Sequence, residues 1–138
     1  MLVHHFLDYY ARNTADAPCL TQDNFTHTYG ELSHRSTQLA CSMLQSGVKK
    51  GERVAILGEN SVEHLLVMIA ASRIGAVAVP LNYRLAPAEL AFIITDAGVR
   101  VLLVLDDLAD TLTELRRQIP NDITLVTQSL ADTHHLQD

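Results

Sequence analysis

The stretch from Arg73 to Arg84, R-I-G-A-V-A-V-P-L-N-Y-R, constrains the fold of this chain more than any other. It predicts that a helix ends at Gly75, that a short buried strand covers residues 77–79, and that the strand stops at Pro80. Proline cannot donate a hydrogen bond to a sheet ladder, which is why a stop is expected there. Leu81 to Arg84 then form a loop at the carboxyl end of the strand, the edge at which open α/β sheets bind ligands.

The residues around this stretch predict a regular alternation of strands and helices. Continuous apolar runs predict buried strands over 54–57, 77–79, 101–105 and 123–126, and apolar stripes at helical spacing predict the helices between them. The βαβαβαβ order predicts an α/β fold with a doubly wound, mostly parallel sheet. We expect one domain over residues 1–128, followed by a polar, frayed tail over 129–138.

The N-terminal part predicts a short helix, a small β-hairpin and a second helix. The first helix rests on apolar residues at helical spacing, namely Val3, Phe6, Leu7 and Tyr10. The hairpin pairs residues 19–21 with 25–28. Thr28 and Glu31 predict a capping box at the start of the second helix, which carries Leu44 on its apolar stripe and ends at Gly47. The same spacing at Asn60 and Glu63 predicts another capping box.

Composition excludes several classes of function. The 138-residue chain has a formal net charge of -6, and its arginines are scattered, so no basic surface for nucleic acid is expected. The longest apolar run, 65–71, is too short to span a bilayer. The N-terminus has neither a basic flank nor a small-residue cleavage site. These features favour a cytoplasmic protein without a membrane span.

Most chemical motifs are missing, so we predict no catalytic residue and no metal site. Neither G-x-G-x-x-G nor a Walker A sequence occurs. Cys41 lies among core positions of the second helix, and Asp106, Asp107 and Asp110 cluster at a helix start, where capping is the simpler role. The seven histidines show no zinc-ligand spacing: His4, His5, His27, His34, His64, His134 and His135.

Arg84 is a charged residue whose position in the sequence is compatible with a role in ligand binding. It follows Asn82 and Tyr83 on the loop at the strand's carboxyl end. A solvated arginine is the simpler interpretation, but the position also suits contact with a phosphate.

Several of these segments together resemble the N-terminal part of the adenylate-forming ligases, which include acyl-CoA synthetases, aryl-CoA ligases, luciferases and peptide-synthetase adenylation domains. The resemblance runs from Val3 to Val126. It is carried by T28-Y-G-E-L32, G47-V-K-K-G-E-R-V54, N60, and R73-I-G-A-V-A-V-P-L-N-Y-R-L-A-P-A-E-L90. Asn82 and the residues after it look more like acyl-CoA or aryl-CoA ligases than peptide-synthetase domains.

The resemblance implies a two-step reaction in which a carboxylate attacks ATP to give an acyl-adenylate, and coenzyme A then displaces AMP. It implies ATP, Mg²⁺ and CoA for the intact enzyme. The family's phosphate loop, ribose-binding acid and catalytic lysines are not found in this sequence. We therefore expect this chain alone to be inactive and to bind none of these cofactors. In some members the loop corresponding to Leu81, Asn82, Tyr83 and Arg84 lies near CoA, which makes these four residues the candidate ligand contacts.

Two interpretations stay open. The chain is either the N-terminal subdomain of an acid–CoA ligase or a stand-alone, non-enzymatic α/β binding module, and a phosphate-loop motif in the reading frame after Asp138 would favour the first. Under both, exposed apolar surface predicts a partner. That partner is either a second copy of this chain or the remainder of the ligase.

Overall fold

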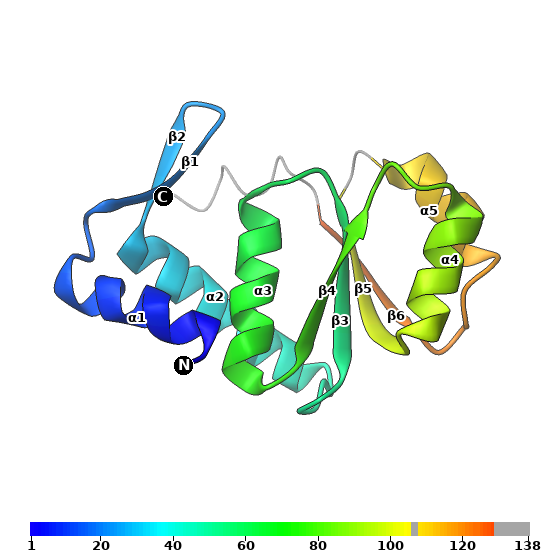
Figure 1. The fold of residues 1–138 in the computed structure, drawn as a ribbon, viewed down its shortest axis with the longest axis horizontal. Helices are drawn as coiled ribbons and strands as arrows, with labels where there is room; N and C mark the ends of the chain where they lie inside the picture. Colours follow the sequence, from blue (N-terminus) through cyan, green and yellow to red (C-terminus); the bar gives the residue numbers. More distant parts are fainter. Residues whose placement is uncertain (106–107, 129–138) are drawn as a thin grey trace. The chain divides into compact units, whose positions relative to one another are not determined.

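Strands and helices alternate along most of the chain in the computed structural model, which describes residues 1–105 and 108–128 (Figure 1). The predicted order of elements is confirmed. The elements are α1 (Val3–Asn13), β1 (Pro18–Gln22), β2 (Phe25–Thr28), α2 (Tyr29–Gln45), β3 (Arg53–Gly58), α3 (Val62–Ile74), β4 (Val77–Asn82), α4 (Pro87–Asp96), β5 (Val99–Leu105), α5 (Ala109–Arg116) and β6 (Thr124–Gln128). They form two compact units, one made of residues 1–51 and 60–77, the other of 52–59 and the described residues from 78 onward.

The second unit is built on a four-stranded sheet with strand order β4-β3-β5-β6. β5 runs parallel to both β3 and β6, so that Val54 pairs with Val101 and Leu102 with Leu125. Buried strands of a parallel sheet need apolar side chains on both faces, and the 54–57 run is fully buried as predicted. Within this unit α4 and α5 contact each other and enclose an apolar core with the sheet (Figure 1).

β4 extends further than the sequence predicts. Pro80 does not end the strand, which continues through Leu81 to Asn82. β4 is an edge strand of the sheet, and a proline is tolerated there because one side of an edge strand has no ladder to complete. The exposed Val77 also differs from the buried position expected for it.

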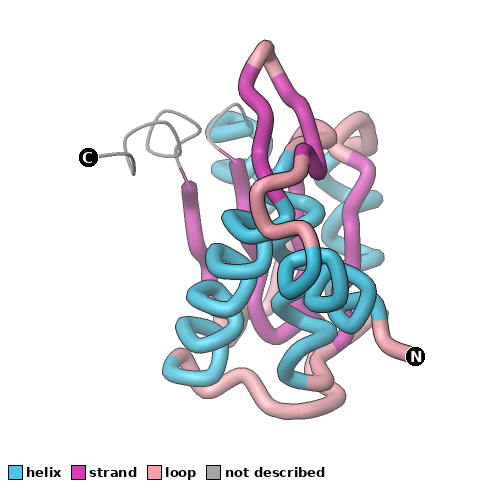
Figure 2. Tube along the Cα trace, turned by 90° about the vertical axis from the view of Figure 1, so that its left-hand side faces the viewer, coloured by secondary structure: helices cyan, strands magenta, loops and turns pink. Residues whose placement is uncertain are grey.

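The first unit joins α1, the hairpin, α2 and α3 around a small apolar core (Figure 2). The predicted hairpin is confirmed, with β1 and β2 antiparallel. The predicted capping box is also confirmed: the Thr28 amide donates to Glu31 at 2.8 Å, and the Glu31 amide donates to the Thr28 hydroxyl at 3.2 Å. Gly47 and Gly75 take left-handed conformations after α2 and α3, as expected of glycines that follow a helix.

The second predicted capping box is wrong. Ser61, not Asn60, is the N-cap of α3, and no side chain of the cap accepts a hydrogen bond from the helix. The Val62 amide instead donates to the side-chain oxygen of Gln22, at 2.8 Å. An acceptor from the hairpin, forty residues away, satisfies a helix-end donor that the local pattern assigned to Asn60.

Four predicted core positions lie on the surface instead. Leu44 and Cys41 of α2 are exposed, because α2 contacts α1 and α3 through the face that carries Leu32, Ala40 and Met43. Phe6 and Val3 of α1 are exposed as well, and within that helix only Leu7 is fully buried.

Among residues 1–105 and 108–128, no helix is long and apolar enough to cross a bilayer. The expected acidic cluster at Asp106 and Asp107, the polar tail over 129–138 and the His134–His135 pair lie outside the described residues.

Candidate functional site

The predicted loop of Leu81 to Arg84 is only half a loop: Leu81 and Asn82 are the last residues of β4, and Tyr83 and Arg84 lie in the turn after it. The four predicted ligand contacts also differ in exposure. The side chain of Leu81 is buried in the core of the second unit, and Tyr83 packs against that core. Asn82 and Arg84 are exposed. Of the four residues, these two therefore present free side-chain surface at the carboxyl end of β4.

Local hydrogen bonds fix the shape of this loop. The side-chain oxygen of Asn82 accepts from the Arg84 amide at 3.1 Å, and the Asn82 carbonyl accepts from the Leu85 amide at 3.1 Å. An asparagine that accepts from the amide two residues on forms an Asx-type turn. Asn82 therefore acts as a turn former, and Arg84 is the charged residue of this turn.

The guanidinium of Arg84 lies against Tyr83. Its Nε donates to the Tyr83 hydroxyl at 3.3 Å, and its central carbon is 5.6 Å from the ring centroid, within the range of a cation–π contact. This hydrogen bond raises the pKa of Arg84, and the carboxylate of Glu59, which follows β3, adds to the effect. The site therefore offers an oriented, permanently charged donor group at the edge where parallel sheets bind ligands.

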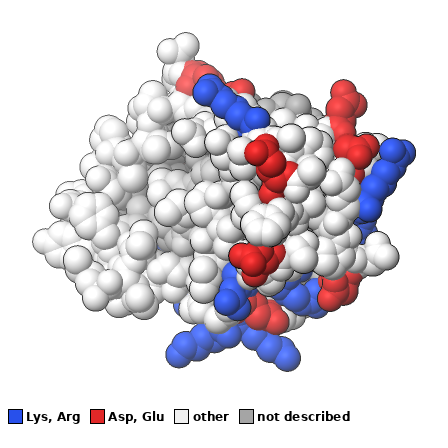
Figure 3. All heavy atoms as spheres, turned by 45° about the vertical axis from the view of Figure 1, so that its right-hand side comes forward, with Lys and Arg blue, Asp and Glu red and all other residues white. Residues whose placement is uncertain are grey.

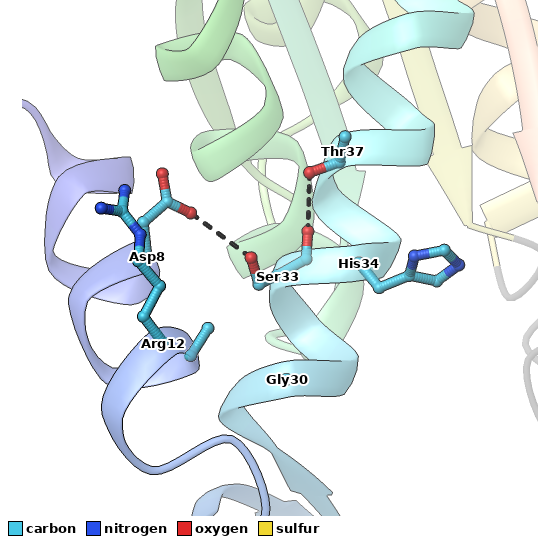
Figure 4. Close-up of a pocket in the computed structure, with 7 residues that line it drawn as sticks. Asp8, Arg12, Gly30, Ser33, His34 and Thr37 are labelled. Carbon is cyan, nitrogen blue, oxygen red and sulfur yellow. Dashed lines mark hydrogen bonds between the residues drawn. The ribbon is translucent and has the colours of Figure 1, made fainter.

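A second polar site lies between α1 and α2, in a hollow of about 490 Å³ (Figure 4). The Ser33 hydroxyl donates to Asp8 at 3.3 Å, and the Thr37 hydroxyl donates to the Ser33 carbonyl at 2.9 Å. In Figure 4 the ring of His34 points away from these groups. Sequence reasoning missed this cluster, because its members come from separate helices.

Arg73 of α3 completes the cluster. Its guanidinium donates to both carboxylate oxygens of Asp8, at 2.9 and 2.6 Å, and also to the hydroxyls of Ser33 and Ser36. These bonds lower the pKa of Asp8. The carboxylate is thus committed to Arg73 and is not placed as a general base.

The Cys19 thiol and the His64 imidazole lie in partly buried surroundings that disfavour their charged forms. Burial raises the pKa of the half-buried Cys19 thiol, which disfavours the reactive thiolate. Burial lowers the pKa of His64, which lies 3.4 Å from the Ser61 hydroxyl. In the part of the chain that the structure describes, no three His, Cys, Asp or Glu side chains are grouped so that they could hold a metal ion.

Charge gives no alternative binding surface on the face shown in Figure 3. Lysine and arginine side chains are interspersed there with aspartate and glutamate, and part of that face carries no charge at all. This distribution does not form the continuous basic surface that nucleic acids require.

The fold defines a class: α/β proteins in which a four-stranded parallel sheet alternates with helices. Comparison with known proteins identifies the family. Residues 7–137 match the model of the AMP-binding enzymes. The chain belongs to the AMP-binding enzyme family.

Individual relatives agree with this assignment. The chain is 38% identical to feruloyl-CoA synthase from Amycolatopsis over 105 residues, which cover 76% of this chain and 21% of that protein. It is 35% identical to 3-hydroxybenzoate–CoA ligase from Aromatoleum over 118 residues, which cover 86% and 23%. The N-terminal domain of FACL13 from Mycobacterium tuberculosis superposes with a TM-score of 0.87 at 28% identity, covering 97% of this chain and 35% of that one. The chain thus spans about a fifth of the length of these curated relatives.

Proposed function

We propose that this chain is the N-terminal subdomain of an acid–CoA ligase, an enzyme that joins a carboxylic acid to CoA through an acyl-adenylate with ATP and Mg²⁺. The family match over residues 7–137 carries the proposal. The two CoA ligases that share 38% and 35% identity with the chain support the choice of CoA as acceptor.

We further propose that these residues do not catalyse adenylation by themselves. Nucleotide phosphates are commonly held by free amides at a helix N-terminus, together with a cation. At α3 the Val62 amide is already bound to Gln22. At α4 the first helical residue is Pro87, which has no N–H, and Glu89 places a carboxylate at that end. The N-termini of α3 and α4 therefore do not fit the triphosphate of ATP.

In the complete ligase, this region supports the larger catalytic domain and presents Arg84 to a phosphate of CoA. The exposed, oriented guanidinium supports this role, because arginine binds phosphate through charge-assisted hydrogen bonds. The Asn82 side chain shapes the turn, and the Leu81 side chain is buried in the core. Our proposal therefore places neither of them in contact with CoA.

Kinetics of a complete ligase that contains this segment test the role of Arg84. We expect Arg84→Ala to raise KM for CoA by about tenfold and to leave adenylation unchanged, since a lost charged hydrogen bond costs roughly 1.5–3 kcal/mol. Arg100→Ala is the matched control, because Arg100 lies near the opposite, amino end of β5 in the same unit. An equal loss of adenylation in Arg84→Ala would show that this residue does not act on CoA.

A further inference from the structure

Tyr83 connects the core of the second unit to the exposed turn after β4. Its ring is half-buried and packs against the core cluster that contains Leu81 and Leu90. Arg84, the next residue, is exposed. The core therefore fixes the tyrosine ring, and its hydroxyl gives the exposed arginine a rigid polar neighbour.

The backbone of Arg84 is fixed by a different residue. Its amide donates to the side-chain oxygen of Asn82 at 3.1 Å, and the Asn82 carbonyl accepts from the Leu85 amide at 3.1 Å. These bonds do not restrain the arginine side chain, which has several rotatable bonds of its own. The orientation of the guanidinium therefore depends on the contacts that the guanidinium itself makes.

The Tyr83 hydroxyl occupies one edge of that guanidinium. It accepts from Nε of Arg84 at 3.3 Å, and the central guanidinium carbon lies 5.6 Å from the ring centroid. A guanidinium binds an oxyanion through two parallel N–H groups, either from Nε and one Nη or from the two Nη atoms. Since Nε is directed at Tyr83, the edge formed by Nη1 and Nη2 remains for a ligand.

Neighbouring groups leave this second edge open. Among residues 1–105 and 108–128, no group accepts a hydrogen bond from Nη1 or Nη2 of Arg84, and no carboxylate forms an ion pair with it. Glu59 acts on Arg84 through its charge alone. Within the described part of the turn, the guanidinium is thus oriented by Tyr83 and not neutralised by an acid.

An orientation that exists before the ligand arrives strengthens binding. An exposed arginine loses rotamer freedom when it binds a phosphate, and a side chain that is already held in place loses less. For one side chain this difference is worth roughly three- to tenfold in affinity. The Tyr83 hydroxyl can therefore affect binding without touching the ligand.

We propose that Tyr83 is a positioning residue for CoA binding, which turns the guanidinium of Arg84 so that Nη1 and Nη2 together face a phosphate of CoA. This inference rests on the proposed role of Arg84. It adds the residue that orients the guanidinium and the edge that binds the phosphate. A tyrosine that only packed against the core would have no effect specific to CoA.

Kinetics of a complete ligase that contains this segment test the positioning role. Tyr83→Phe keeps the ring and removes the acceptor oxygen. We expect it to raise KM for CoA by about threefold and to leave kcat and the rate of adenylation unchanged. Tyr9→Phe is the matched control, because Tyr9 is an exposed tyrosine of α1 in the other unit. It should leave KM for CoA unchanged.

A double-mutant cycle separates action through Arg84 from direct contact with CoA. In the Arg84→Ala enzyme, adding Tyr83→Phe should change KM for CoA by less than about 1.5-fold, because no guanidinium is left to orient. An equal increase in both backgrounds would show that Tyr83 acts on CoA by itself and would overturn the inference. So would an unchanged KM for CoA in Tyr83→Phe, or an equal loss of adenylation.

A measurement without CoA distinguishes failure of this inference from failure of the proposed function. In the isotopically labelled 138-residue chain, nuclear magnetic resonance should show faster exchange of the Arg84 Nε proton with water in Tyr83→Phe than in the wild type, because its acceptor is lost. Equal exchange in the two chains would overturn the orienting contact alone. Faster exchange in Tyr83→Phe together with an unchanged KM for CoA in Arg84→Ala would refute the proposed role of Arg84, and this inference with it.

Discussion

Arg73 holds Asp8 with two hydrogen bonds, of 2.9 and 2.6 Å, across 65 residues of sequence. The two side chains join α3 to α1 and are largely shielded from water. Ser33 and Ser36 of α2 accept further hydrogen bonds from the same guanidinium. One ion pair therefore links the three helices of the first unit.

We expect Asp8→Asn to lower the free energy of unfolding by about 2 kcal/mol, because a shielded guanidinium loses its paired charge. Glu114→Gln provides the matched control. Glu114 lies 3.5 Å from Arg117 in an exposed pair, and its loss should cost less than about 1 kcal/mol. Urea denaturation measures both, and equal costs would show that the Asp8–Arg73 pair does not stabilise the unit.

The same pair predicts a dependence of stability on acid. Hydrogen bonding to Arg73 lowers the pKa of Asp8 in the folded chain, whereas the unfolded chain keeps an ordinary value of about 3.9. The carboxylate therefore contributes its full stabilisation above about pH 4 and loses it as the pH falls through the lowered folded pKa.

Unfolding free energies of the wild-type chain and of Asp8→Asn, measured across this acid range, isolate that contribution. The two values should converge as the pH falls. His4, which lies near Asp8 and also titrates, is present in both chains, so its own contribution largely cancels. A difference between the two chains that stays constant down to about pH 2 would contradict the assignment.

Sequence patterns succeeded where the deciding contacts are local. The capping box of Thr28 and Glu31 spans one turn, and both of its hydrogen bonds form as the spacing predicts. The buried strand over 54–57 also follows from its own residues. The left-handed glycines after α2 and α3 were likewise predictable from the residue type at those positions.

The sequence patterns failed where contacts between residues far apart in the sequence determine the local structure. Asn60 and Glu63 have the same spacing as the confirmed box, but Gln22 satisfies the helix end. Pro80 alone predicts the end of a strand, but β4 lies at an edge of the sheet, where a proline is tolerated. The Asp8–Arg73 pair has no local signal, because its partners lie on separate helices. At the candidate site, the position of Arg84 was predictable, while its contact with the Tyr83 ring was not.

Gln22 gives a direct test of one such distant contact. We expect Gln22→Ala to destabilise the chain by about 1 kcal/mol, since the Val62 amide loses its acceptor. Gln22→Glu keeps an acceptor oxygen and adds a negative charge at a helix N-terminus, so it should retain stability. Asn60→Ala should have little effect, as Asn60 does not cap α3. Thermal unfolding of the three variants separates these cases, and a larger loss in Asn60→Ala would restore the local capping box.

Carboxylate-dependent exchange of labelled pyrophosphate into ATP tests the central claim most directly. The assay uses the purified 138-residue chain, Mg²⁺, ATP and a panel of aromatic and aliphatic acids, with a complete relative such as feruloyl-CoA synthase as positive control. We predict exchange by the complete relative and none above the blank by this chain. Exchange by this chain that depends on an added acid would contradict the account.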